Sequence, residues 1–192
     1  LYGPPGTGKT AFGQHLAEAL DLPLLVRRAS DIISPWLGMT EKNIAMMFQQ
    51  AGEEECVLLL DEADSFMQDR QSAQRNWEIT EVNEMLTQME DFKGIFIAST
   101  NLMNTLDAAA LRRFDLKIRF DFLKPDQAWS MFLDTAASLG IEVGTLPEMK
   151  HCLERLNSIT PGDFANIMRQ SKLRRITDAH SLLARLSDEC AC

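Results

Sequence analysis

The sequence lacks the features that mark metal-bound, membrane-spanning or secreted proteins. Its four cysteines, Cys56, Cys152, Cys190 and Cys192, show no C-x-x-C spacing and no paired histidines, which argues against a zinc site. No apolar run approaches the roughly 20 residues that span a bilayer, and no signal peptide is visible. We therefore expect a cytoplasmic protein in a reducing setting, with no membrane segment in this chain.

The sequence also lacks an excess of basic residues and an initiator Met. Lys and Arg number 19 against 28 Asp and Glu, so the net charge is −9 and the basic face typical of nucleic-acid-binding proteins is not expected. An initiator Met is also missing, because the sequence starts at Leu1, directly before its first motif. We expect a fragment that is truncated at its N-terminus.

Short apolar runs alternate with helical periods up to Lys124, and only helical periods follow. Such alternation predicts right-handed crossovers and a mostly parallel sheet. The sequence thus predicts an α/β fold, with a five-stranded parallel sheet and flanking helices in residues 1–124 and a small all-helical domain in residues 125–192. The expected strands are Leu1–Tyr2, Leu24–Val26, Cys56–Leu60, Gly94–Ala98 and Leu116–Phe122.

Two threonines are candidates for helix N-caps. Thr40 precedes apolar residues in a helical period, and Thr160 precedes Pro161 at the first helical position and Asp163 at the third. Cys56 opens an apolar run and is expected to be a small core residue.

A phosphate-binding loop follows the first expected strand. Residues 3–10 match the pattern G-x-x-x-x-G-K-[ST] between a strand and a helix. The glycines let successive N–H groups face one anion, and the helix N-terminus adds positive potential. Lys9 is expected to reach the β- and γ-phosphates of ATP, and the Thr10 hydroxyl to bind Mg²⁺. The alternative, a structural glycine turn, is disfavoured because every motif position is filled. The predicted nucleotide-binding residues are Gly3, Pro4, Pro5, Gly6, Thr7, Gly8, Lys9, Thr10 and Ala11.

A second motif ends the strand expected at Cys56–Leu60. Asp61 is expected to bind Mg²⁺, and Glu62 beside it to orient or deprotonate the attacking water. An acidic cluster at a strand end is the simpler interpretation, but it is disfavoured after a complete phosphate loop. The pair predicts an ATPase.

With these motifs in this order, the chain resembles the AAA family of ring-forming ATPases. Ile97–Asn101 looks like the sensor-1 strand, and the resemblance implies a catalytic role for Asn101 near the γ-phosphate. Leu106–Asp115 resembles the end of the second region of homology, which implies that Arg112 and Arg113 are arginine fingers for a neighbouring subunit. The two arginines stand without the usual spacer, so which one is the finger stays open. They could instead stabilise the end of a short helix or pair with nearby acids.

The resemblance extends to substrate handling. Trp36-Leu37-Gly38, after Pro35, looks like the pore loop of AAA protein remodellers. The Trp at this position makes the loop similar to that of the katanin and spastin group. A core Trp that anchors a loop is the alternative. The family implies a homo-oligomeric, hexameric ring that acts on a protein substrate, with residues 125–192 as the helical lid. No motif for a second pore loop can be recognised within Asp69–Asn76.

Two other functions compete with a protein-remodelling ATPase. Asp61-Glu62-Ala63-Asp64 spells the DEAD tetrad of helicases, which would indicate a nucleic-acid motor. The acidic charge and the form of the phosphate loop argue against it. A non-motor ATP-binding regulator is the other possibility. Some AAA modules are fused to zinc peptidases, but no H-E-x-x-H occurs in this sequence.

Overall fold

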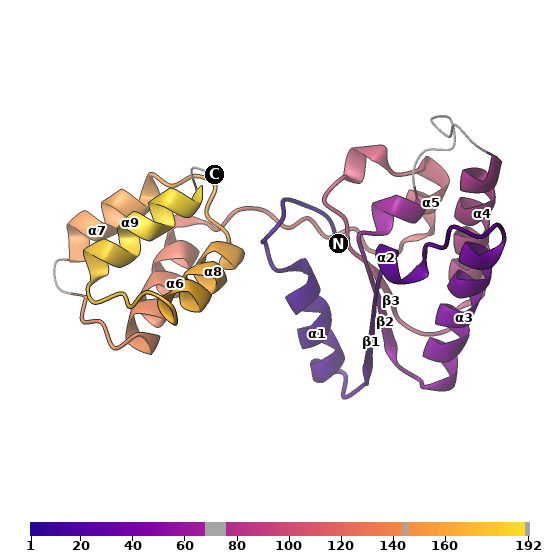
Figure 1. The fold of residues 1–192 in the computed structure, drawn as a ribbon, viewed down its shortest axis with the longest axis horizontal. Helices are drawn as coiled ribbons and strands as arrows, with labels where there is room; N and C mark the ends of the chain where they lie inside the picture. The colour runs from indigo at the N-terminus through magenta and orange to yellow at the C-terminus, as the bar shows by residue number, and fades with distance from the viewer. Residues whose placement is uncertain (68–75, 144–145, 191–192) are drawn as a thin grey trace. The chain divides into compact units, whose positions relative to one another are not determined.

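The computed structural model describes residues 1–67, 76–143 and 146–190. The chain divides into two compact units, one of Leu1–Gly3 with Lys9–Phe120 and one of Pro4–Gly8 with Asp121–Cys192. The first holds a β-sheet and the second a group of helices, each described below by itself (Figure 1). Within the described residues, no helix is both long and apolar enough to cross a membrane.

The sheet is parallel and has three strands in the order β1 (Leu24–Arg28), β2 (Val57–Asp61) and β3 (Phe96–Ala98). The parallel α/β class is thus confirmed, but the expected count of five strands is not reached in the described part of the chain. The other two segments form only single parallel bridges, from Tyr2 to Thr100 and from Tyr2 to Arg119. Gly3 already turns into the phosphate loop, so Tyr2 alone forms the bridges of the expected strand Leu1–Tyr2.

Both faces of the sheet are covered, which explains the uninterrupted apolar run in β2 (Figure 1). Leu58 and Leu60 belong to a core with α3 (Met39–Glu53) and α4 (Asn76–Asp91), whereas Leu59 faces α1 (Lys9–Ala19). Helix α1 lies so close to the sheet that a Cβ on Gly13 would be 2.1 Å from Leu59 Cδ1. The short elements are α2 (Ala29–Ile32), η1 (Ala63–Phe66), η2 (Met103–Thr105) and α5 (Ala108–Arg113).

Two residue-level predictions in this unit have opposite outcomes. Cys56 is buried in the core, as predicted, and burial raises the pKa of its thiol. The prediction that Thr40 caps α3 is wrong, because the helix begins at Met39 after Gly38, which has a φ of 77°. Thr40 is buried in the first turn, where its hydroxyl accepts a hydrogen bond from the Ser34 N–H at 3.1 Å.

The second unit contains α6 (Pro125–Ser138), α7 (Leu146–Glu154), α8 (Pro161–Ser171) and α9 (Ala179–Cys190), packed around their own apolar core. Phe132, Phe164 and Leu182 are at its centre. The predicted cap of α8 is confirmed: the Thr160 hydroxyl accepts from the Asp163 N–H, and the Asp163 carboxylate accepts from the Thr160 N–H at 2.7 Å.

Candidate active site

The predicted phosphate loop leads into α1, whose first residue is Lys9. Lys9 is only 7% exposed, and its Nζ donates a hydrogen bond to the Gly3 carbonyl oxygen at 2.9 Å. Burial lowers the pKa of Lys9 below its usual value, and the Asp61 carboxylate opposes that shift in part. The amine is therefore held against the loop, at the helix end that attracts anions.

The middle of the loop is in close contact with the start of α8. The Gly162 N–H donates a hydrogen bond to the Gly6 carbonyl oxygen at 2.9 Å. A Cβ on Gly162 would lie 2.9 Å from Gly6 Cα, and one on Gly6 would lie 2.8 Å from Thr160 Oγ1. Gly6 also has a φ of 76°, which favours glycine. The shape of the loop therefore depends on small residues in both segments.

Asp61 lies at the carboxyl end of β2, where three donors fix its side chain. Its Oδ2 accepts a hydrogen bond from Thr10 Oγ1 at 3.0 Å, and its Oδ1 accepts from the Glu62 N–H at 3.1 Å. The Ser99 hydroxyl donates to the same Oδ1. The contact with Thr10 joins the phosphate loop to the strand end, and it brings together two hard oxygen ligands of the type that Mg²⁺ prefers.

Glu62 follows Asp61 in a left-handed backbone conformation, with φ 59° and ψ 40°. Such a conformation is uncommon for a residue other than glycine, and strained backbone is enriched at functional sites. Ala63 fixes the turn, because its N–H donates to the Ser99 carbonyl oxygen at 2.9 Å. The Glu62 side chain is exposed. It is therefore accessible beside the fixed Asp61 carboxylate.

Asn101 lies beyond β3, at the same edge of the sheet as Asp61. Thr100, which precedes it, donates a hydrogen bond to Asp64 Oδ1 at 2.6 Å. Asn101 itself is exposed, and in the described residues its side chain makes no hydrogen bond. Since the carboxyl ends of parallel strands form the ligand-binding edge of such sheets, the structure brings the predicted acidic and amide groups to one edge.

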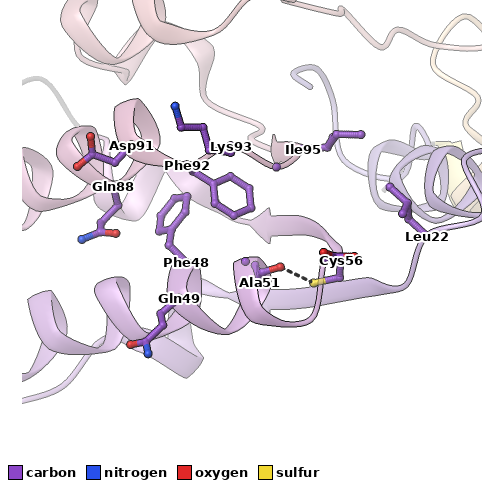
Figure 2. Close-up of a pocket in the computed structure, with 13 residues that line it drawn as sticks. Leu22, Phe48, Gln49, Ala51, Cys56, Gln88, Asp91, Phe92, Lys93 and Ile95 are labelled. Atoms are coloured by element: carbon purple, nitrogen blue, oxygen red, sulfur yellow. Dashed lines mark hydrogen bonds between the residues drawn. The ribbon is translucent and has the colours of Figure 1, made fainter.

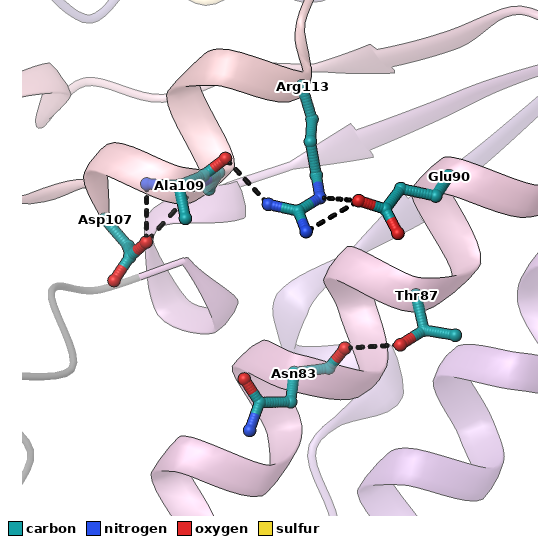
Figure 3. A network of polar contacts seen from close by, with 7 residues as sticks. Asn83, Thr87, Glu90, Asp107, Ala109 and Arg113 are labelled. Atoms are coloured by element: carbon teal, nitrogen blue, oxygen red, sulfur yellow. Dashed lines mark hydrogen bonds and ion pairs between the residues drawn. The ribbon is translucent and has the colours of Figure 1, made fainter.

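The two neighbouring arginines have different surroundings. Arg113, at the end of α5, forms an ion pair with Glu90 of α4 at 2.6 Å and donates to the Ala109 carbonyl oxygen at 3.0 Å (Figure 3). The ion pair agrees, for Arg113, with the alternative interpretation that the arginines pair with nearby acids. Arg112 is exposed, and no carboxylate in the described part of the chain pairs with it.

Trp36 and Leu37 lie between α2 and α3 and are 75% and 83% exposed. The interpretation of Trp36 as a core anchor is therefore wrong. A hollow of about 420 Å³ adjoins these side chains, with Glu41 and Glu81 also lining it. The candidate second pore loop falls almost wholly on residues 68–75, which lie outside the described residues.

Comparison with known proteins identifies the family. Residues 1–122 match the model of the ATPase family associated with various cellular activities (AAA). The chain belongs to the AAA family. An uncharacterized AAA family ATPase, y4kL of Sinorhizobium fredii, is 40% identical over 66% of this chain and 38% of its own length. The AAA chain is also 33% identical to the ATP-dependent zinc metalloprotease FtsH of Clostridium perfringens, over 92% of this chain and 26% of the relative.

A third relative, cell division protein C of Sulfolobus acidocaldarius, is 27% identical over 93% of this chain and 50% of its own length. The AAA chain thus spans half or less of each of these relatives. Its family makes it an ATPase module. The similarity of Trp36 to the katanin and spastin group stays a prediction.

Sequence reasoning missed three residues that support the candidate site. Ser99 and Thr100 bind the carboxylates of Asp61 and Asp64, and Gly162 contacts the phosphate loop. The hydroxyls could have been found, because they follow the apolar run of a strand next to β2. No sequence signal indicated Gly162, since its role depends on a contact between segments distant in the chain.

Proposed function

We propose that this chain binds Mg-ATP at the carboxyl edge of its sheet and hydrolyses the γ-phosphate by in-line attack of water. Residues 1–124 would act as the ATPase core and residues 125–192 as the lid. The observation that carries the proposal is the position of Asp61, which is bonded to Thr10 of the phosphate loop and followed directly by Glu62. One carboxylate thus links the nucleotide loop to the candidate base.

Each candidate residue has a chemical role in this proposal. Residues 3–11 would hold the phosphates through backbone N–H groups, and the Lys9 ammonium would neutralise the β- and γ-phosphates. Thr10 and Asp61 would hold Mg²⁺, which supplies charge neutralisation on the phosphate oxygens when bound. Magnesium sites of this type use one or two protein ligands, with water and substrate oxygens completing the set.

The remaining roles concern the attacking water and the charge that develops during transfer. Glu62 would accept a proton from the water, and the Asn101 amide would orient it. We assign Arg112 as the finger that stabilises the developing negative charge in a neighbouring subunit, because Arg113 is already paired with Glu90. The exposure of Glu62, Asn101 and Arg112 supports this, since all three must reach groups outside their own segment.

The substitution Glu62→Gln tests the reaction. It keeps the side-chain size and removes the base, so turnover should fall by about a hundredfold or more, while ATP affinity stays within about twofold of the unchanged protein. Equilibrium binding of a fluorescent ATP analogue and steady-state phosphate release measure the two quantities. Glu18→Gln, on the exposed side of α1, is the matched control and should change neither. Equal loss of binding and turnover in Glu62→Gln would contradict the role as base.

We further propose that hydrolysis drives the handling of a protein substrate by a homo-oligomeric ring. The exposed Trp36 and Leu37, with Gly38 after them, offer an amphipathic surface that holds varied side chains. The names of the FtsH relatives associate this module with proteolysis, but any peptidase activity would have to lie outside this chain. A cytoplasmic location is part of the proposal, because the described cysteines are all free thiols.

Experiments can distinguish the proposed function from the two alternative functions that the sequence suggested. A nucleic-acid motor would show salt-dependent RNA binding by the purified chain, which the net charge of −9 disfavours. A non-motor regulator would show turnover per molecule that does not depend on protein concentration. No feature of the described residues favours either over the remodelling ATPase.

A further inference from the structure

The segment between α2 and α3 borders a hollow that the proposed reaction does not use. Residues 34–38, Glu41 and Glu81 line this Trp36 hollow, which has a volume of about 420 Å³. Trp36 and Leu37 are 75% and 83% exposed, so their apolar surface is open to a partner. The volume falls in the range of about 300–1,000 Å³ that is typical of ligand pockets. The hollow can therefore take up part of a binding partner.

The Trp36 hollow lies toward the N-terminal ends of α3 and α4, which pack against each other. Glu41 is in the first turn of α3, and Glu81 is in the first half of α4. Phe48 in α3 and Phe92 directly after α4 are also in contact, with ring centroids 5.4 Å apart. The two helices therefore run in the same direction, and each contributes one carboxylate to the same hollow.

The charge of the Trp36 hollow is negative. Among the described residues, Glu41 and Glu81 are the only charged ones that line it. Glu41 forms no ion pair with another described residue, and Lys42 beside it is exposed without lining the hollow. The N-terminus of α3 adds about half a positive charge, which offsets part of the two carboxylates but not their sum. Exposed apolar surface beside net negative charge suits a partner that is both apolar and cationic.

We propose that the Trp36 hollow selects polypeptide segments in which apolar residues are interspersed with lysine or arginine. The apolar side chains of such a segment would pack on Trp36 and Leu37. Its cationic side chains would face Glu41 and Glu81, and the indole ring of Trp36 also attracts cations. The net charge of −9 acts in the same direction, because the field of the whole chain attracts cationic partners. The inference rests on the proposed function, in which the Trp36 segment handles a protein substrate, and adds the class of that substrate.

A second hollow provides a matched control. It lies toward the other end of the same two helices and has a volume of about 640 Å³. Figure 2 shows the rings of Phe48 and Phe92 facing each other there, with Asp91 and Lys93 beside them. Glu55 also lines this hollow. Glu55→Gln with Asp91→Asn removes two negative charges from the chain, as a pair of amides in the Trp36 hollow does, but leaves the Trp36 hollow unchanged.

Peptide binding measures the selection. Three glycine- and serine-rich peptides of equal length, with the same leucines, carry lysine, glutamine or glutamate at the positions between them. Fluorescence anisotropy with Mg²⁺ and a non-hydrolysable ATP analogue gives their affinities. In Glu41→Gln with Glu81→Gln, the preference for the lysine peptide over the glutamate peptide should fall by at least about fivefold, because two ion pairs are lost. In Glu55→Gln with Asp91→Asn, the preference should stay within about twofold of that of the unchanged protein.

Charge reversal tests the same selection through a gain of binding. An acid in the first turn of α3 also stabilises that helix, so a loss of binding alone would not separate the two roles of Glu41. Glu41→Lys with Glu81→Lys should make the protein prefer the glutamate peptide, which a weakened helix cannot do. Added salt should reduce either preference. An unchanged preference for the lysine peptide in both the amide and the lysine variants would overturn the inference.

Trp36→Ala keeps this inference separate from the proposed function. All three peptides should bind it more weakly, because the apolar surface is lost. Peptides that bind through Trp36 with no preference for charge would overturn the inference alone. Peptide binding that does not depend on Trp36 would count against the proposed handling of a protein substrate and would remove the inference with it.

Discussion

Lys9 is a buried amine on a loop that must attract a polyanion, and the two properties act in opposite directions on its charge. Burial lowers its pKa, whereas Asp61 and a bound phosphate favour the ammonium form. Lys9→Met keeps the aliphatic length without the charge. ATP affinity should fall by at least about tenfold, because charge-assisted hydrogen bonds are lost. Isothermal titration measures it, and Lys117→Met, on an exposed lysine, should bind as the unchanged protein does.

The lowered pKa of Lys9 also predicts a pH dependence. Only the protonated amine attracts phosphate, so affinity should fall as the pH rises through this lowered pKa, at a lower pH than an ordinary lysine would titrate. In Lys9→Met, the affinity should be flat over the same alkaline range. A parallel decline in both proteins would show that another group causes it.

At the scale of elements, α5 presents two adjacent arginines whose effects should separate. Arg113→Ala removes the ion pair between α5 and α4, in which the side chains are 29% and 56% exposed, so the free energy of unfolding should fall by at most about 1 kcal/mol. Arg112→Ala should leave stability unchanged but lower turnover by about a thousandfold or more. Thermal unfolding and phosphate release measure the two effects. The reverse result would make Arg113 the finger.

The segment between α2 and α3 gives a second prediction at this scale. Trp36→Ala should spare basal turnover, because Trp36 lies between α2 and α3, outside the phosphate loop and the ends of β2 and β3. It should abolish the stimulation of turnover by an unfolded polypeptide such as casein, whereas Trp36→Phe should retain most of it. Stability should not change, since the side chain is 75% exposed. Casein stimulation that survives in Trp36→Ala would remove the pore assignment.

The elements also show what the sequence could and could not predict. Strands β1, β2 and β3 and the Thr160 cap were predictable, because uninterrupted apolar runs and capping residues are local signals. The prediction of Thr40 as a helix cap was wrong, because Gly38, in a left-handed backbone conformation, is the N-cap of α3 two residues earlier. Ser99 bonding to Asp61 and Gly162 contacting Gly6 were beyond reach, because such contacts depend on how distant segments meet. The candidate catalytic and binding residues could be predicted from local motifs, whereas the residues that hold them in place could not.

At the scale of the whole molecule, the central question is whether each site is completed by a neighbouring copy. If Arg112 acts in trans, turnover per molecule should rise steeply with protein concentration and then level off, as copies assemble. The Arg112→Ala and Glu62→Gln variants should each be nearly inactive when alone. Their mixture should regain part of the activity, because a Glu62→Gln copy supplies Arg112 to a neighbour that retains Glu62.

The mixture is decisive because the two variants lack different parts of one composite site. Phosphate release from equimolar samples measures the recovery, and sedimentation of the same samples confirms that they assemble. Arg113→Ala mixed with Glu62→Gln serves as the control, since a variant that keeps Arg112 should show only the sum of the separate activities. An assembled but inactive mixture of the first pair would place Arg112 in its own site, and turnover independent of concentration would favour a non-motor regulator.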